Sequence, residues 1–142
     1  MIFDHVGIAV EDLDQAERLY ASALGGKPAH RFDLPHEAVR VAWLETGSAA
    51  IELLTPTGDG AIARFLRKRG PGLHHIAFRV DTIEVALKTL KAGGYELIDE
   101  RARPGLCGRP IAFVHPRTTG GVLIELCEGG LKLPADSQKE KR

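Results

Sequence analysis

The sequence predicts an α+β fold in which two tandem βαβββ modules form a curved mixed sheet around a metal-containing cleft. The first observation is that one strand pattern occurs twice, as "FDHVGIAV" at residues 3–10 and as "LHHIAFRV" at residues 73–80, each time with a histidine near its start. The second is that a helix, further strands and a last strand with an embedded glutamate follow each copy, with a period of about seventy residues. Such a period indicates an internal duplication with a pseudo-two-fold axis.

Each element of this order follows from a local pattern. Residues 2–10 are rich in β-branched side chains, which favour a strand. Apolar residues at helical spacing predict helices over 11–24 and 82–92, and a pair of glycines ends each of them. A shorter helix over 59–69 carries cations at its C-terminal end, where they complement the helix dipole. The remaining predicted strands are 36–46, 48–56, 74–80, 95–100, 108–116 and 121–128.

The length of 142 residues predicts one compact domain or two half-domains that share a core. We expect a single domain over 1–129, with module one at 1–58, a linking helix at 59–72 and module two at 73–129, followed by a polar C-terminal tail at 130–142.

Composition narrows the class of protein. Nineteen lysines and arginines balance nineteen aspartates and glutamates, so the charge does not point to a nucleic-acid or membrane partner. Cys107 and Cys127 are too few for a disulfide framework and lack CxxC spacing, so we interpret them as structural thiols. Apolar runs are strand-sized, and no basic segment precedes a long apolar run at the N-terminus. We therefore expect a cytoplasmic protein with neither a membrane span nor a signal peptide.

The two strand histidines lie at matching positions. Because side chains alternate along a strand, His5 shares a face with Gly7, and His75 shares a face with Ala77. Both histidines lie opposite the bulky apolar face, and the small residue beside each one leaves room for a ligand.

Two glutamates repeat in the same way, Glu52 in "AAIELL" and Glu125 in "VLIELC". A carboxylate within an apolar strand is costly to bury unless it is paired or binds a metal. Two imidazoles and two carboxylates suit a borderline divalent transition metal. We therefore predict His5, Glu52, His75 and Glu125 as metal ligands. His74 is a competing ligand, but the alignment of the two repeats favours His75.

Other residues have two interpretations. His115, before Pro116, either contacts a substrate or closes a turn. His30 and His36 fall in a predicted loop and are expected to be solvated. The basic segment 64–69 is either a solvated helix face or a surface that binds phosphates.

The repeated halves and the His/Glu pairs resemble the vicinal oxygen chelate superfamily, which contains glyoxalases, bleomycin resistance proteins and dioxygenases. The resemblance covers residues 2–128, and the stretch "DHVGIAVEDLDQA" is general to the superfamily. The stretches "IARFLRKRGPGLHHIAFRVD" and "GRPIAFVHPRTTGGVLIEL" are more specific and are similar to the methylmalonyl-CoA epimerases. Glyoxalase I enzymes more often carry a DPDG-like turn where this chain has His115 and Pro116.

The resemblance implies an isomerase that interconverts (2R)- and (2S)-methylmalonyl-CoA through a metal-stabilised enolate, with glutamates transferring the proton. It implies Co2+ as the metal, with Ni2+, Zn2+, Mn2+ and Mg2+ also compatible. It further implies a homodimer that takes a small-molecule acyl-CoA substrate. Arg109 and the basic segment 64–69 are candidates for binding the CoA nucleotide.

The chain departs from some epimerases at two positions. Those enzymes use a glutamate as one base and a glutamine as a ligand, and the matching positions here are Val41 and Glu52. Our hypothesis is that Glu52 and Glu125 are ligands that also act as the two catalytic bases. Glu37 is a further candidate base.

Three other functions are compatible with parts of the pattern. Bacterial lactoylglutathione lyases (glyoxalase I) use the same His/Glu ligand set. An extradiol dioxygenase needs two histidines and one carboxylate, so the fourth predicted ligand argues against it. A non-enzymatic small-molecule-binding protein of the same fold does not need the metal ligands at all, and fold alone does not separate these functions.

Overall fold

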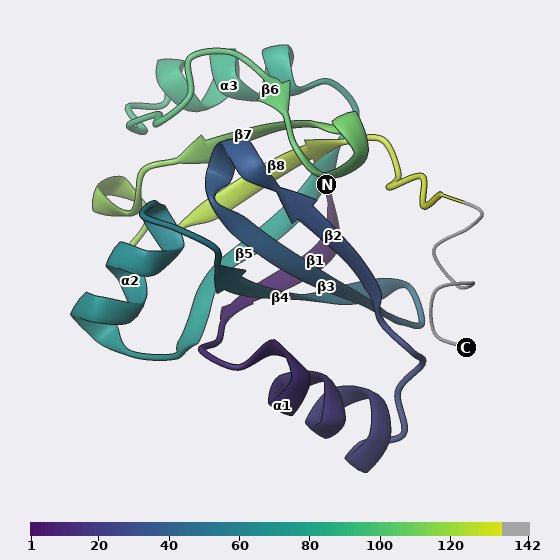
Figure 1. Cartoon of the computed structure of the whole chain (residues 1–142). Coiled ribbons are helices and arrows are strands. Elements are labelled where there is room, and N and C mark those ends of the chain that lie inside the picture. The colour runs from purple at the N-terminus through teal and green to yellow at the C-terminus, as the bar shows by residue number, and fades with distance from the viewer. Residues whose placement is uncertain (135–142) are drawn as a thin grey trace. The chain divides into compact units, whose positions relative to one another are not determined.

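The structure is a computed structural model that describes residues 1–134 and divides the chain into two compact units (Figure 1). The amino-terminal unit contains His5–His74 with Pro134, and the carboxy-terminal unit contains Met1–Asp4 and His75–Leu133. The predicted tail lies partly outside the described residues, and the single-domain division stays a prediction. Within residues 1–134, no helix is both long and apolar enough to cross a membrane.

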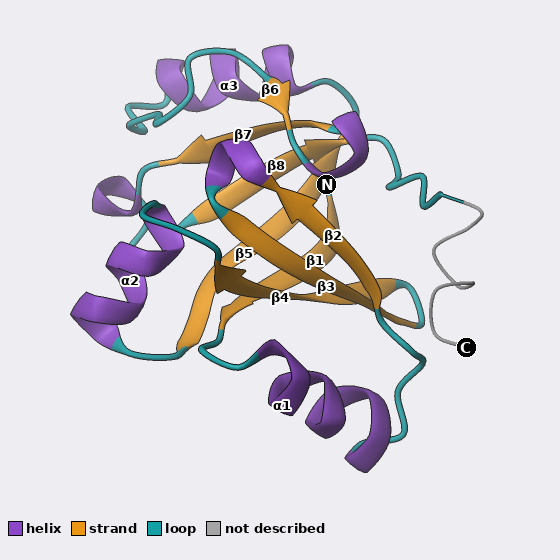
Figure 2. Cartoon of the chain, viewed as in Figure 1, coloured by secondary structure: helices purple, strands orange, loops and turns teal. Residues whose placement is uncertain are grey.

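The amino-terminal unit has a mixed sheet with the strand order β2-β3-β4-β1 (Figure 2). Strands β1 and β4 pair in parallel, and the other neighbours pair antiparallel. The elements in chain order are β1 (Ile2–Ala9), α1 (Leu13–Glu17), a π-helical segment (Arg18–Ala23), β2 (His30–Leu34), a 3-10 turn (Pro35–Glu37), β3 (Val39–Thr46), β4 (Ala49–Pro56) and α2 (Ala61–Arg69).

Helix α1 covers one face of this sheet. Leu13 packs there with the buried Ala42, Leu44 and Leu53 of β3 and β4. Apolar side chains at alternate strand positions and at helical spacing bury one face of each element together, which stabilises the pair. The opposite face of the sheet is therefore the one that carries His5 and Glu52.

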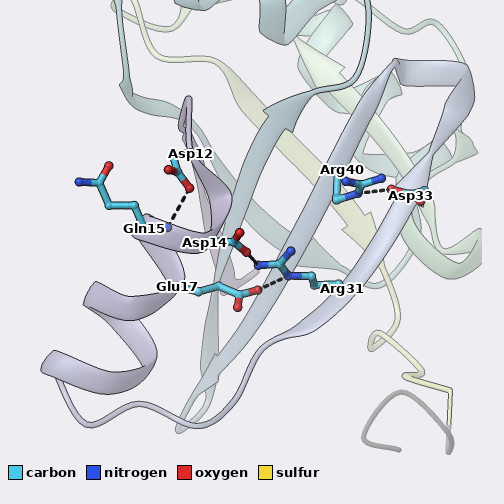
Figure 3. Close-up of polar contacts among 7 residues, drawn as sticks. All are labelled: Asp12, Asp14, Gln15, Glu17, Arg31, Asp33 and Arg40. Atoms are coloured by element: carbon cyan, nitrogen blue, oxygen red, sulfur yellow. Dashed lines mark hydrogen bonds and ion pairs between the residues drawn. The ribbon is translucent and has the colours of Figure 1, made fainter. Parts of the chain in front are cut away.

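Polar contacts add to the attachment of α1 (Figure 3). The Asp12 side chain accepts a hydrogen bond from the Gln15 backbone N–H at 3.0 Å and so caps the first turn. Arg31 of β2 donates from Nε to Glu17 at 2.7 Å and also pairs with Asp14. These contacts join the helix to the outermost strand of the unit.

The carboxy-terminal unit has the other half of the strand order, β5-β8-β7-β6. Strands β5 and β8 pair in parallel, and the other neighbours pair antiparallel, as in the first unit. The elements are β5 (Gly72–Val80), α3 (Ile83–Ala92), β6 (Arg103–Pro104), a 3-10 turn (Leu106–Gly108), β7 (Pro110–Val114), a 3-10 turn (Pro116–Thr118) and β8 (Ile124–Glu128).

Helix α3 covers one face of the strands of the carboxy-terminal unit, as α1 does in the amino-terminal unit (Figure 1). Ile83 and Leu87 pack against the buried Ala112, Val114 and Leu126. The first turn of α3 is held by the Glu128 carboxylate, which accepts a hydrogen bond from the Ile83 N–H at 3.0 Å. A carboxylate at a helix N-terminus is favourable because it satisfies an unpaired N–H and complements the dipole.

The structure corrects the prediction of a strand over 95–100. Within that segment only Leu97 makes a bridge, to Val114. The Asp99 side chain accepts a hydrogen bond from the Phe113 N–H at 2.8 Å, and the Ile98 N–H donates to Phe113 O at 3.0 Å. Side-chain bonding by aspartate competes with a regular strand ladder, and the short strand β6 takes the edge position instead.

A second correction concerns the segment after the first helix. His30 was expected in a loop, but it begins β2, which pairs with β3 along its whole length. The segment "HRFDL" alternates polar and apolar residues, as a half-buried strand does, but its polar residues led to the prediction of a loop. The predicted helix over 11–24 is also α-helical only to Glu17 and continues as the π-helical segment Arg18–Ala23.

Ile83 and Val85 provide a test of the packing between α3 and its sheet. Ile83 is 0% exposed and Val85 is 63% exposed on the same helix. We expect Ile83→Ala to lower the free energy of unfolding by about 2–5 kcal/mol, because it leaves a cavity in the core. The measurement is urea denaturation, with Val85→Ala as the matched control, for which we expect a change within about 0.5 kcal/mol. Equal losses in the two variants would contradict the packing described.

Candidate metal centre

One His/Glu pair lies on the uncovered face of the amino-terminal sheet. His5 is on β1 and Glu52 on β4, and the register that pairs Gly7 with Glu52 places both side chains on this face. The His5 Nε2 lies 3.9 Å from the Glu52 Oε1. The exposed fractions are 2% for His5 and 8% for Glu52. A buried carboxylate that faces an imidazole is one of the arrangements that offset the cost of its burial.

Trp43 of β3 completes the surroundings of this pair. It is the register partner of Glu52, and its ring lies edge to face with the His5 ring at a centroid distance of 4.9 Å. Two residues earlier, Val41 is fully buried on the same face. Val41 occupies the position that aligns with the glutamate base expected in some epimerases. The sequence analysis missed Trp43, although strand alternation from Val41 would have placed it beside Glu52.

The equivalent pair in the carboxy-terminal unit is closer. His75 is on β5 and Glu125 on β8, where Ala77 is the register partner of Glu125. The His75 Nε2 lies 2.9 Å from the Glu125 Oε2, and the exposed fractions are 5% and 6%. The two predicted pairs are therefore each brought together by adjacent parallel strands.

The second oxygen of Glu125 has a different neighbour. The Cys127 thiol donates to Glu125 Oε1 at a distance of 3.7 Å. Burial, followed by the charge of Glu125, raises the pKa of the Cys127 thiol above its ordinary value, so the thiol stays protonated and can donate. Cys127 is thus a structural thiol as predicted, but it contacts a predicted ligand, which its spacing of two residues on one strand could have indicated.

The donors fit a divalent metal. Each pair offers one imidazole nitrogen and one carboxylate oxygen, and all four residues are buried. Imidazole and carboxylate ligands suit zinc, nickel, cobalt and manganese, whereas a thiolate-rich site would select softer metals. Each pair can supply two of the ligands that such an ion needs.

His74 and His115 each make a structural contact: His74 packs against an aromatic ring, and His115 accepts a hydrogen bond within a turn. The His74 ring lies edge to face with Phe65 of α2 at a centroid distance of 4.9 Å. It alternates with His75 along β5 and so takes the other face. His115 accepts a hydrogen bond at Nδ1 from the Arg117 N–H at 3.0 Å, which favours the turn-closing interpretation of this residue.

The remaining candidates lie in varied surroundings. Glu37 is exposed in the 3-10 turn before β3, so its predicted role as a base stays a prediction. In the basic segment, Arg67 pairs with Asp59 at 3.1 Å, and the Arg69 guanidinium lies over the Phe65 ring at 5.8 Å. Arg109, a candidate for the CoA nucleotide, is instead buried.

Arg109 forms a buried ion pair with Asp4. Its Nη1 and Nη2 donate to the two carboxylate oxygens at 2.8 and 2.6 Å, and its Nε donates to Gly129 O at 3.0 Å. Burial by itself would lower the pKa of Arg109, but the hydrogen bonds to Asp4 and the surrounding negative charges together raise it above its ordinary value. The guanidinium therefore has a structural role at the start of β1.

We expect Arg109→Met to lower the free energy of unfolding by about 3–5 kcal/mol, because it removes the guanidinium that bonds both oxygens of the buried Asp4 carboxylate. Urea denaturation measures the loss. Arg101→Met, at an exposed arginine of the preceding segment, is the control and should change stability by less than about 0.5 kcal/mol. If the two variants were equally stable, the ion pair would not contribute to stability as described.

Known proteins resemble this chain over most of its length. Residues 4–113 match the model of the glyoxalase/bleomycin resistance protein/dioxygenase superfamily. The uncharacterized protein YqjC of Bacillus subtilis (strain 168) is 42% identical over 126 residues, which cover 88% of this chain and 90% of that protein. The mitochondrial methylmalonyl-CoA epimerase of Bos taurus is 40% identical over 125 residues, covering 87% of this chain and 71% of the relative.

A solved structure extends the likeness to three dimensions. The crystal structure of methylmalonyl-CoA epimerase from Mycobacterium tuberculosis has a TM-score of 0.85 and 40% identity, covering 91% of this chain and 88% of the other. This likeness confirms the predicted fold class.

Proposed function

The chain belongs to the glyoxalase/bleomycin resistance protein/dioxygenase superfamily, and on this basis we propose that it is a methylmalonyl-CoA epimerase, a metal-dependent isomerase that interconverts the (2R) and (2S) forms of its substrate. The observation that carries the proposal is the likeness to epimerases in both sequence and fold. Within the chain, the support is one buried His/Glu pair in each unit.

We propose that His5, Glu52, His75 and Glu125 hold one divalent metal ion together. Supporting this, each histidine points its Nε2 toward the glutamate of its own unit, and all four residues are buried. A divalent cation supplies Lewis-acid stabilisation of the negative charge that develops on the thioester oxygen. Co2+ is our proposal for the metal, and Ni2+, Zn2+, Mn2+ and Mg2+ have compatible donor preferences.

The glutamates are proposed to move the proton. Inversion at a carbon needs a proton acceptor on one face and a proton donor on the other. Glu52 and Glu125 supply one carboxyl group from each unit. The ionised one accepts the C2 proton, and the other, in its carboxylic acid form, returns a proton to the opposite face of the carbon. The Cys127 thiol contacts Oε1 of Glu125, whereas Oε2 is the oxygen that faces His75. Glu37 remains a further proposed base.

The alternatives are less well supported. A lactoylglutathione lyase would use the same donor set, but the relatives with named activities are epimerases. A non-enzymatic binding protein would have no need to bury two carboxylates beside imidazoles, which costs stability unless the site is used.

The proposal also covers the oligomeric state, the compartment and the residues that bind the CoA nucleotide. We propose that the protein acts as a homodimer in the cytoplasm, which its family resemblance and cysteine content support. With Arg109 paired to Asp4, the exposed cations of segment 64–69 are the better candidates for the CoA nucleotide.

Deuterium exchange at C2 of methylmalonyl-CoA, followed by NMR in deuterated water, tests the activity. We expect rapid exchange with the cobalt-loaded protein and a rate lower by about 10²–10⁴-fold in Glu125→Gln, because the proton acceptor is lost. His75→Ala should lose exchange together with metal binding. A protein that binds cobalt but shows no exchange would contradict the proposal, and methylglyoxal with glutathione would then be the substrate to assay.

Glu52→Gln separates the two roles of Glu52. An amide oxygen can still bind the metal but cannot accept the proton, so we expect cobalt to be retained while exchange slows. Cobalt content by elemental analysis and the exchange rate are measured on the same sample. Retained cobalt with a full exchange rate would make Glu52 a ligand only.

A further inference from the structure

Each unit carries a row of four side chains, one from each of its four strands. In the amino-terminal unit, Trp43 is the register partner of both Glu52 and His30. In the carboxy-terminal unit, Phe113 is the register partner of Glu125, and Arg103 pairs with Ile111, two residues before Phe113 on the same face. The rows are His5, Glu52, Trp43 and His30 on β1, β4, β3 and β2, and His75, Glu125, Phe113 and Arg103 on β5, β8, β7 and β6.

The third member of each row is aromatic and contacts the histidine. Trp43 lies 4.9 Å from His5 between ring centroids, with an interplanar angle of 65°. Phe113 lies 5.7 Å from His75, with an angle of 89°. Edge-to-face contacts of this kind are favourable beyond the area they bury, and they depend on ring orientation.

We propose that Trp43 and Phe113 are positioning residues, each of which holds the imidazole of its own unit with Nε2 toward the glutamate. The inference rests on the proposed metal-dependent function. An imidazole can rotate about its terminal torsion, which has broad minima. An aromatic ring against its edge restricts that rotation and lowers the cost of ordering the ligand when a metal binds.

The two aromatic residues are themselves fixed in different ways. Trp43 is buried within its sheet. Phe113 is half-buried, and the Arg103 guanidinium lies over its ring at 5.4 Å. Asp99 connects the two, because its Oδ1 accepts from Arg103 Nε at 3.1 Å and its Oδ2 accepts from the Phe113 N–H at 2.8 Å. The cation–π contact is therefore anchored to the same strand that carries the ring.

The experiment compares Phe113→Leu with Phe113→Tyr. Leucine keeps an apolar side chain but removes the ring, whereas tyrosine keeps the ring. Phe78→Leu is the matched control, because Phe78 lies on the other face of β5 from His75 and packs on Phe3 with a centroid distance of 6.0 Å. For each protein we measure the Co2+ dissociation constant by chelator competition, the 15N resonances of the His75 ring in metal-free protein, and stability in urea.

We expect Phe113→Leu to raise the Co2+ dissociation constant by at least about tenfold and to shift or broaden the His75 ring resonances, as loss of a residue that orients a ligand does. Phe113→Tyr should stay within about twofold of the wild type, and Trp43→Leu and Trp43→Phe should act in the same way on His5. The control should lose stability without moving the His75 resonances.

The proposal is overturned if Phe113→Leu leaves the His75 resonances and the cobalt affinity unchanged, or if Phe113→Tyr loses both as fully as Phe113→Leu. None of these readouts uses the substrate. A wild type that binds cobalt but does not exchange methylmalonyl-CoA would therefore refute the epimerase activity and leave this inference standing. If the wild type bound no cobalt, the ring resonances of the metal-free protein would decide by themselves.

Discussion

The burial of one carboxylate beside one imidazole in each unit is the constraint on which the rest of the structure depends. Glu52 and Glu125 lie in apolar strands, where an ionised carboxylate is expensive unless a partner compensates it. The compensation comes from the neighbouring parallel strand, at 3.9 Å in one unit and 2.9 Å in the other. Parallel pairing of the strand that carries the histidine with the strand that carries the glutamate thus sets the geometry of the proposed metal site.

The face of each unit that its helix covers supplies the apolar core, and this core offsets the cost of burying the polar His/Glu pair on the other face. In each unit a helix and alternate strand residues form an apolar core on one face, so the face with the His/Glu pair does not need to supply all of the hydrophobic stabilisation. The pair is instead surrounded by groups that fix its geometry: Trp43 in one unit, and Phe113 with the Cys127 thiol in the other. Both halves of the duplicated sequence therefore use one face for the apolar core and the other face for the His/Glu pair.

The parts that could be predicted from the sequence are those with strong periodicity or exact repetition. Strand alternation and the repeat placed both His/Glu pairs, and the apolar spacing placed α3 within a residue at its start. The alignment of the two repeats favoured His75 over His74, and in the structure the His74 ring packs against Phe65 instead.

The parts that could not be predicted depend on partners distant in sequence. Strand β2 alternates polar and apolar residues weakly, and it is defined by pairing with β3. The segment around Asp99 looked like a strand, but a side chain took over the hydrogen bond from Phe113. The burial of Arg109 follows from Asp4, which lies 105 residues away, and no local pattern signals such a pair.

The order of the strands has a consequence for how the protein folds. His5 and Glu52 are 47 residues apart in sequence, and His75 and Glu125 are 50 apart, yet each pair sits on neighbouring strands. A contact between such distant residues closes a long loop and forms slowly, whereas the hairpin of β3 and β4 is local. Each ligand pair is therefore completed only when the hairpin strand docks beside the first strand of its unit. A nascent chain would therefore not present both His/Glu pairs before Glu125 has been synthesised.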